Sequence, residues 1–318
     1  MLRYTRELSV ALAYLLLLLL LAVAAPSFYQ GDKLLTILVG SAPVLVAVVG
    51  MTLVILSRHI DISVGAQIAL CGVAAGLLAK SGQPIGLVVV ETVALGAALG
   101  ALNGALVAGA GLPSIVVTLA TWVMLREGLR WWREGESVKN LPPGFQWFGL
   151  GQDAGQWLSV AVALAVFLAF AWGLSYSAPG RAVYATGSDP EAAFLVGIRP
   201  RRVVFAVFVL MGTLGGLAAV LDAVRFADVE ASARTGLEMQ IIAAVVVGGV
   251  AISGGRGTLV GPLIGVALLA TVRPALTFLH VEAYWDTAIQ GGIILLAVAS
   301  EALAGKRRKD ARTRLAGA

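Results

Sequence analysis

Charged residues are scarce in this chain. Asp, Glu, Lys and Arg make up 13% of its 318 residues, about half of the roughly 25% found in an ordinary soluble domain. A soluble fold of this size needs polar side chains over its surface, and a disordered chain is rich in charge and poor in apolar residues. The composition therefore excludes both classes.

Metal-binding and catalytic residue types are also rare. The single cysteine, Cys71, excludes a disulfide within the chain and a cysteine-rich metal site. The two histidines, His59 and His280, are far apart in sequence, which argues against a histidine-based metal site. The chain has neither a phosphate-binding G-x-x-x-x-G-K-[ST] run nor a G-x-S-x-G nucleophile motif. We predict no catalytic residue, no metal and no cofactor of its own.

Apolar sequence dominates instead, with 59% hydrophobic residues and a mean hydropathy of +0.90. A membrane-spanning helix needs ~20 apolar residues, and backbone groups in lipid must bond within their own segment. We predict an all-α polytopic membrane protein, one domain over residues 1–318, with about ten transmembrane or membrane-embedded helices. The predicted segments are 8–25, 34–56, 62–79, 85–109, 112–129, 157–177, 203–224, 239–252, 258–279 and 284–303.

Two of these segments have alternative interpretations. The first follows two arginines and ends in a small-residue run that resembles a signal-peptide cleavage site, but its length favours an uncleaved span. The segment 239–252 is short and interrupted by Gly248 and Gly249, so a re-entrant segment competes with a full span.

Basic residues predict the orientation, because Lys and Arg are enriched in cytoplasmic loops. With the N-terminus inside and ten alternating segments, most basic residues fall inside, including the loop 178–202 and the tail 304–318. We therefore predict a multi-pass protein of the cytoplasmic (inner) membrane, surrounded by lipid, with both termini cytoplasmic. The net charge of +5 then needs no nucleic-acid partner. Tryptophans around the external loop 130–156 indicate interfacial anchoring, with sugar stacking as the alternative.

Glycines recur at four-residue spacing, which lets two helix backbones approach closely. We expect them to serve helix packing within the chain, with contact to a second copy as the alternative. The three patterns are Gly96/Gly100/Gly104, Gly212/Gly216 and Gly257/Gly261/Gly265.

The internal loop 178–202 carries the clearest functional pattern. Ser188 or Asp189 is a suitable helix cap, and Pro190 fits the first turn. Glu191 then lies near the positive end of the helix dipole, and Gly197 can end the helix. The pattern predicts a short cytoplasmic helix that either rests on lipid headgroups or fits a groove on a soluble partner. Its small central residues, Ala192 and Ala193, favour the partner.

Five stretches together resemble one family. Residues 187–198, GSDPEAAFLVGI, are similar to the coupling-helix loop of ATP-binding-cassette importer permeases. Residues 60–65, IDISVG, match the signature of the ribose, rhamnose and autoinducer-2 branch. The order and spacing agree over nearly the whole chain, although Arg58 and His59 stand where many relatives have two glycines. The other matching stretches are PSIVVTL at 113–119, GLEM at 236–239 and the glycine-rich 248–261.

The resemblance implies a permease subunit of a sugar or autoinducer importer. It implies a second permease, identical or related, two cytoplasmic ATPases that carry the ATP and magnesium, and an external binding protein that delivers the solute. It also implies that residues 189–197 dock on the ATPase. Substrate identity stays open among pentoses, deoxyhexoses, autoinducer-2-like furanoses and nucleosides, and related branched-chain amino acid permeases keep an amino acid as the nearest alternative.

Polar residues in the apolar segments are candidates for the solute pathway or its gate, because such residues are costly in a membrane. Each has a structural alternative, namely capping for Asp61, or an ion pair with Arg58, and interhelical hydrogen bonding for the amides. Few of these residues are ionisable, which argues against an ion-coupled secondary transporter. Asn103 is the foremost candidate, and Glu91 is either a pathway residue or an interfacial one. The other candidates are Asp61, Ser63, Gln67, Thr118, Gln240 and Gln290.

Overall fold

The computed structural model describes residues 5–230 and 236–279, together with residues 282, 285, 288, 289, 291, 292 and 295. This part of the chain is almost entirely helical, and the one β-bridge in it joins Val138 to Val229. The helices are α1 (Thr5–Ala24), α2 (Gly31–Leu56), α3 (Val64–Lys80), α4 (Ile85–Gly104), α5 (Ser114–Arg133), α6 (Gln152–Tyr176), α7 (Ala178–Ser188), α8 (Pro190–Leu195), α9 (Pro200–Ala223), α10 (Leu237–Val247) and α11 (Val260–Phe278). Short 3-10 or π turns are η1 (Pro26–Tyr29), η2 (Ala105–Gly109) and η3 (Gln146–Gly149).

This architecture confirms the predicted all-α membrane fold. Six described helices are long and apolar enough to cross a membrane, and α4 does so together with η2. Eight predicted segments coincide with α1, α2, α3, α4, α5, α6, α9 and α11. The segment 284–303, with Gln290, and the tail 304–318 lie outside the continuously described residues.

Helix α10 explains why the segment 239–252 was ambiguous. It has 11 residues, so at a rise of 1.5 Å per residue it is about 16 Å long, roughly half the ~30 Å hydrocarbon core. The chain turns at Gly248 and Gly249 and returns as α11, against which α10 packs. The segment is therefore not one full-length spanning helix: α10 is a half-length helix followed by a glycine turn.

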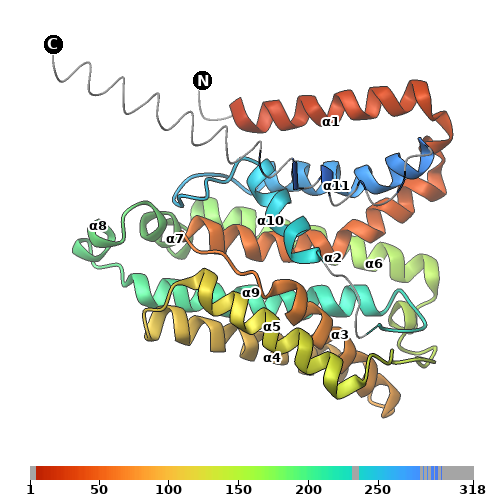
Figure 1. Ribbon diagram of the computed structural model, residues 1–318, viewed down its shortest axis with the longest axis horizontal. Coiled ribbons are helices and arrows are strands. Elements are labelled where there is room, and N and C mark those ends of the chain that lie inside the picture. Colours follow the sequence, from red (N-terminus) through yellow and green to blue (C-terminus); the bar gives the residue numbers. More distant parts are fainter. Residues whose placement is uncertain are drawn as a thin grey trace.

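Helices α2 and α9 form the centre of the bundle (Figure 1). Helix α9 packs against α2, α3 and α4, and residues 44–56 of α2 are buried all round. Helix α1 lies at the edge, with α11 beside it, and turns most of its leucines outward. A helix that is apolar on every side is expected inside a membrane bundle, and an outward leucine face suits lipid contact.

Glycines bring α4 and α9 into backbone contact. A Cβ at Gly96 would overlap the Gly212 carbonyl oxygen, and one at Gly100 would overlap that of Phe208. A Cβ at Gly216 would lie 2.7 Å from the carbonyl oxygen of Thr92. Gly104 is less crowded, with the nearest atoms 3.1 Å away. These contacts lie within one chain, as expected for the first two glycine patterns.

The third pattern is only partly helical. Gly261 and Gly265 lie on α11, where a Cβ would overlap the carbonyl oxygens of Gly248 and Ala244. Gly257 precedes the helix and has φ of 137°, so it serves the preceding loop. The prediction that all three glycines share one helix face is therefore wrong for Gly257, because α11 begins at Val260.

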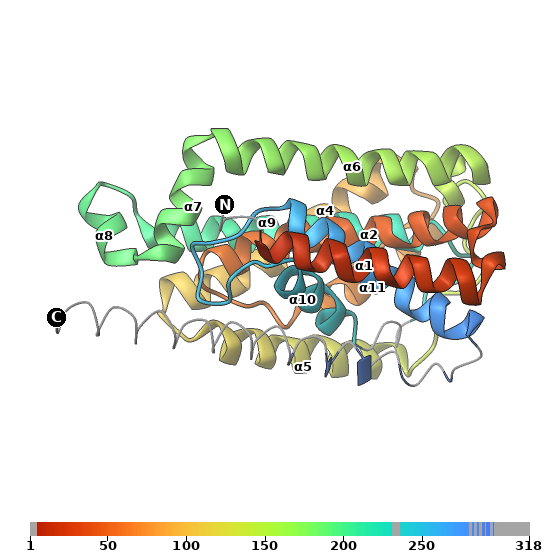
Figure 2. The same ribbon diagram turned by 90° about the horizontal axis from the view of Figure 1, so that it is seen from above.

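Basic loops gather at one end of the bundle. Helices α7 and α8 project beyond it there, next to the start of α1 and the ends of α2 and α10 (Figures 1 and 2). This end includes Arg58, Arg181, Arg199 and Arg256. At the opposite end, α5 extends to Arg133 and α6 begins at Gln152, so the external loop is shorter than the predicted 130–156. The arrangement follows the predicted alternation of the segments.

We predict that Gly100→Ala lowers the free energy of unfolding by ~1–3 kcal/mol, because α4 must move away from the backbone of α9. Gly86→Ala on the same helix is the control, since its Cβ would meet nothing within 4 Å. That control should be neutral or stabilising by less than ~1 kcal/mol. Thermal unfolding in detergent measures both variants, and equal midpoints would contradict the backbone contact.

Candidate functional site

A buried hydrogen-bond network joins the 57–63 loop to α3, α4 and α5. Asn103 Nδ2 on α4 donates to Ser63 Oγ over 2.8 Å, and Thr121 Oγ1 on α5 donates to Asn103 Oδ1 over 2.8 Å. Gln67 Nε2 donates to Ser63 Oγ over 2.7 Å. Thr118 Oγ1 accepts the backbone N–H of Ile62 over 3.1 Å. Five of the pathway candidates therefore lie in one cluster.

Asp61 is the charged member of this network and is fully buried. Its carboxylate accepts hydrogen bonds from the backbone N–H and the hydroxyl of Ser63, and from Gln67 Nε2 over 3.3 Å. These bonds close a turn just before α3, whose start has no side-chain capping bond, so Asp61 does not cap the helix in the predicted way. No ion pair with Arg58 is present among the described residues.

Two members of the network, Ser114 and Thr121, were absent from the predicted set. Ser114 Oγ accepts the backbone N–H of Ile60 over 3.4 Å. The signal was present in the spacing of Ser114, Thr118 and Thr121, which places three hydroxyls on one face of α5. That face is buried while the apolar Val116 and Met124 point outward, so α5 is polar on its inner side.

Three other polar residues lie outside this network, two on α10 and one on α4. Gln240 is half-buried on α10, and none of the described network bonds reaches it. Glu91 is half-buried on α4. Glu238, on the first turn of α10, is 5% exposed and lies against Gly65 of α3, where a Cβ would overlap its carboxylate. In the sequence, Glu238 is distinguished only as part of the GLEM stretch.

The predicted coupling helix is α8. Asp189 caps it, with one carboxylate oxygen accepting the N–H groups of Glu191 and Ala192, each over 3.0 Å. Gly197 follows the helix with φ of 86°, and Ser188 ends α7. The loop therefore holds two helices, α7 and α8, where the sequence predicted one.

The exposed tip of α8 is apolar and differs from the predicted contact surface. Ala193 is 3% exposed and packs inside the loop, whereas Phe194, Leu195 and Val196 are 66%, 85% and 76% exposed. Pro190 is half-buried, and Glu191 and Ala192 are exposed beside it. A contiguous apolar tip on a projecting loop is typical of a protein–protein contact.

An outward cavity of about 300 Å³ lies between α3 and the outer end of α9. Its floor is apolar, with Ile68 and Ala69 of α3 and Ala219 of α9. Its polar lining consists of carboxylates, and Phe226 adds one aromatic ring. The three acids are Asp222, Asp228 and Glu230.

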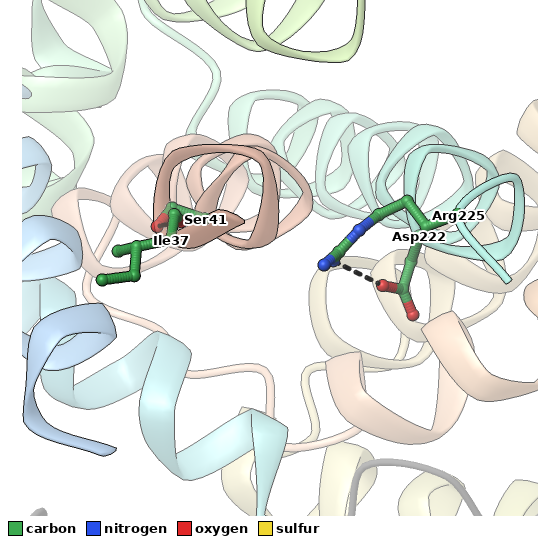
Figure 3. Close-up of polar contacts among 4 residues, drawn as sticks. All are labelled: Ile37, Ser41, Asp222 and Arg225. Atoms are coloured by element: carbon green, nitrogen blue, oxygen red, sulfur yellow. Dashed lines mark hydrogen bonds and ion pairs between the residues drawn. The ribbon is translucent and has the colours of Figure 1, made fainter. Parts of the chain in front are cut away.

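Arg225 follows α9 directly, lies beside this cavity and reaches toward α2. Its guanidinium Nη1 pairs with Asp222 Oδ1 over 3.3 Å, and both side chains are mostly buried. Figure 3 shows the Arg225 side chain extending from the end of α9 toward α2, where Ser41 donates its hydroxyl hydrogen to the Ile37 carbonyl over 2.6 Å. A Cβ at Gly40 would lie 3.5 Å from the Arg225 guanidinium.

The external loop closes over the outer end of α9. Val138 and Val229 exchange backbone hydrogen bonds of 2.8 and 3.0 Å, and Trp147 N–H donates to Val224 O over 2.7 Å. Asn140 N–H donates to Asp228 Oδ1 over 2.9 Å. The exposed tryptophans, Trp131, Trp132 and Trp157, flank this loop as expected for interfacial anchors.

Arg58 stands where many relatives have glycine, and its backbone has a conformation that favours glycine. Its φ is +72°, a left-handed conformation that costs a non-glycine residue roughly 1–2 kcal/mol. His59 follows it, and burial together with the Arg58 charge lowers the pKa of the His59 imidazole. The local backbone therefore has the geometry of a glycine turn, although it carries two basic side chains.

Comparison with known proteins gives one consistent result. The family model described as "Branched-chain amino acid transport system / permease component" matches residues 33–298. The ribose import permease protein RbsC of Escherichia coli K12 is 34% identical over 291 residues, covering 90% of this chain and 91% of that protein. The autoinducer 2 import system permease protein LsrC of Escherichia coli O157:H7 is 35% identical over 303 residues, covering 92% and 85%. No solved structure matches significantly.

Removing the Asn103 amide should test the network. Asn103→Ala leaves the buried hydroxyl of Ser63 without its α4 partner, so we predict a loss of ~1–3 kcal/mol in unfolding free energy. Ser175→Ala is the control, because that exposed hydroxyl bonds only to its own helix and should matter by less than ~0.5 kcal/mol. Chemical unfolding in detergent compares them, and an Asn103 variant as stable as the parent would refute an interhelical role.

Proposed function

The chain belongs to the family of branched-chain amino acid transport system permease components, and on that premise we propose that it is the membrane-spanning subunit of an ATP-driven importer for a sugar or sugar-like solute. RbsC and LsrC, which it resembles over most of its length, are named as ribose and autoinducer 2 import permeases. The observation that carries the proposal is the projecting loop with α8 at its tip, at the end of the bundle where basic residues gather.

ATP hydrolysis belongs, in this proposal, to a cytoplasmic ATPase that binds α8. The tip formed by Phe194, Leu195 and Val196 is too apolar to favour water and lies beyond the bundle, away from the helices that face lipid. Surrounding arginines add a positive rim that steers an acidic groove toward it. They are Arg181, Arg199, Arg201 and Arg202, all exposed. The geometry supports a knob that inserts into a partner's groove.

The outer cavity supports a polyhydroxylated solute. Carboxylates accept hydrogen bonds from hydroxyl groups, and an aromatic ring such as Phe226 can pack against the apolar face of a sugar. At about 300 Å³ the cavity is at the lower end of the range for small-molecule sites. We propose that an external binding protein delivers the solute at this end and that the cavity is its entry.

The remaining parts of the assembly follow from the same proposal. A second permease, identical or related, would complete the pathway, and both termini would lie on the cytoplasmic side with α7 and α8. The basic loops at that end support this orientation, and the membrane in the proposal is the cytoplasmic one.

A branched-chain amino acid is the second candidate solute, because the matching family model is described by that substrate. The names of RbsC and LsrC favour a sugar-like solute over it. Asp222, Asp228 and Glu230 would attract the ammonium group of an amino acid and repel its carboxylate, so these two effects offset each other, whereas a neutral sugar needs only the hydrogen bonds that carboxylates accept.

Transport by the complete assembly tests the function directly. Proteoliposomes with this chain, its ATPase and its binding protein should take up radiolabelled ribose, or a related sugar that competes with it, only when ATP reaches the ATPase. Excess leucine should leave this uptake unchanged. Uptake by the chain alone under an ion gradient would contradict an ATP-driven importer. If leucine competed for uptake and no sugar did, the solute would be an amino acid and the proposed sugar would be wrong.

The tip of α8 gives a second test. Leu195→Asp places a charge in the apolar contact, so we predict that affinity for the ATPase falls about tenfold or more. Leu150→Asp is the control, because Leu150 is also exposed, at 59%, but lies at the opposite end of the bundle. Co-purification and ATPase stimulation measure the effect. If the Leu195→Asp and Leu150→Asp variants co-purified equal amounts of the ATPase, α8 would not be its docking site.

A further inference from the structure

The end of α7 meets the loop between α10 and α11 through bare backbone. A Cβ at Gly187 would overlap the Leu56 carbonyl oxygen and lie 2.8 Å from the Gly255 nitrogen. A Cβ at Gly254 would lie 2.8 Å from the Gly187 carbonyl oxygen. Gly255 N–H donates to Leu56 O over 2.9 Å. With no side chain between them, these segments have no rotamer change to absorb a displacement, so motion of one must shift the other.

Tyr184 adds a directional bond to the same contact. Its phenol, one turn before Gly187 on α7, donates to the Gly257 carbonyl over 2.8 Å. Gly257 belongs to the loop, where its backbone packs against Val250. Tyr184 therefore ties the helix that carries α8 to the loop that ends α10.

The 248–257 loop is held together by hydrogen bonds within its own backbone, and it follows directly on α10. Ala251 N–H donates to Arg256 O over 2.9 Å, and Gly254 N–H donates to Ala251 O over 2.9 Å. Gly248, the last residue of the α10 turn, is packed against Pro262 and Gly261 of α11. A displacement of this loop would therefore be transmitted to the C-terminal end of α10.

The other end of α10 reaches the buried polar cluster. Glu238, on its first turn, lies against Gly65, two residues after Ser63 of the network. Ala244 and Gly248 of the α10 region touch the backbone of α11 at Gly265 and Gly261, so α10 would shift against α3 together with the start of α11. Helix α10 therefore connects the cytoplasmic junction to the middle of the membrane.

We propose that Tyr184 and the Gly187–Gly254–Gly255 contact form a second coupling point, through which displacement of α8 shifts α10 against α3. Tyr184 is a positioning residue in this scheme and does not touch the solute. The inference rests on the proposed function and deepens it by naming the element that moves when the ATPase acts.

The first experiment compares Tyr184→Phe with Tyr176→Phe in the complete importer. Tyr176 is 72% exposed, close by on α6, and has no part in the junction. We expect both variants to bind the ATPase and to support hydrolysis, while ribose uptake per ATP hydrolysed falls about 3- to 10-fold for Tyr184→Phe alone, the range produced by losing one net hydrogen bond. Unchanged coupling in Tyr184→Phe would overturn the inference.

The second experiment follows α10 itself. Spin labels at Met239→Cys on α10 and Leu102→Cys on α4, in a Cys71→Ala background, report their separation in the ATPase complex with and without trapped nucleotide. The distance should change in the parent and change less in Tyr184→Phe. A fixed distance in an actively transporting parent would overturn the inference alone. A parent that neither binds an ATPase nor imports would overturn the proposed function, and the inference with it.

Discussion

Close contact between two backbones, with no side chain between them, is the interaction on which this structure depends. In lipid, helices gain little from hiding apolar surface from one another, so their association relies on close packing. Glycine supplies that packing in three places here. They are the crossing of α4 and α9, the turn between α10 and α11, and the junction of α7 with the 248–257 loop. A change as small as one methyl group would separate any of them.

Backbone contact through glycine has different consequences at the α4–α9 crossing and at α10. Helices α4 and α9 touch over two turns, from Gly96 to Gly104, and α9 also packs on α2 and α3. That group is a rigid body. Helix α10 is half as long as a span, touches the backbone of α11 at Ala244 and Gly248, and meets α3 through the Glu238–Gly65 contact. The close backbone contacts of α10 are therefore with α11, and those of α4 are with α9, so the bundle contains two separate glycine-packed helix pairs.

Runs of apolar residues were sufficient to predict the long spanning helices, because ~20 apolar residues in succession have few alternatives. The cap at Asp189 and the glycine crossing at Gly100 were also predictable, since both depend on local spacing. Contacts between distant segments were not. The bond from Tyr184 to Gly257 joins residues 73 positions apart, and the outer cavity exists because residues 138 and 229 form a bridge. The tip of α8 was misjudged because the sequence does not say which face of a six-residue helix turns inward, so Ala193 was expected outside.

The buried polar residues bear on how such a protein is powered. A carboxylate in a membrane protein often marks ion coupling, but Asp61 is surrounded by donors from Ser63 and Gln67 that hold it in place at the start of α3. Asn103 and Thr121 are likewise occupied by each other. Polar groups satisfied in this way stabilise one arrangement of α3, α4 and α5, and they are poor carriers of a moving ion. The force for transport must then enter from the surface. Among the described residues, the end of the bundle that carries α7 and α8 has a projecting apolar tip on α8, and α7 joins that tip to the half-length helix that reaches the network.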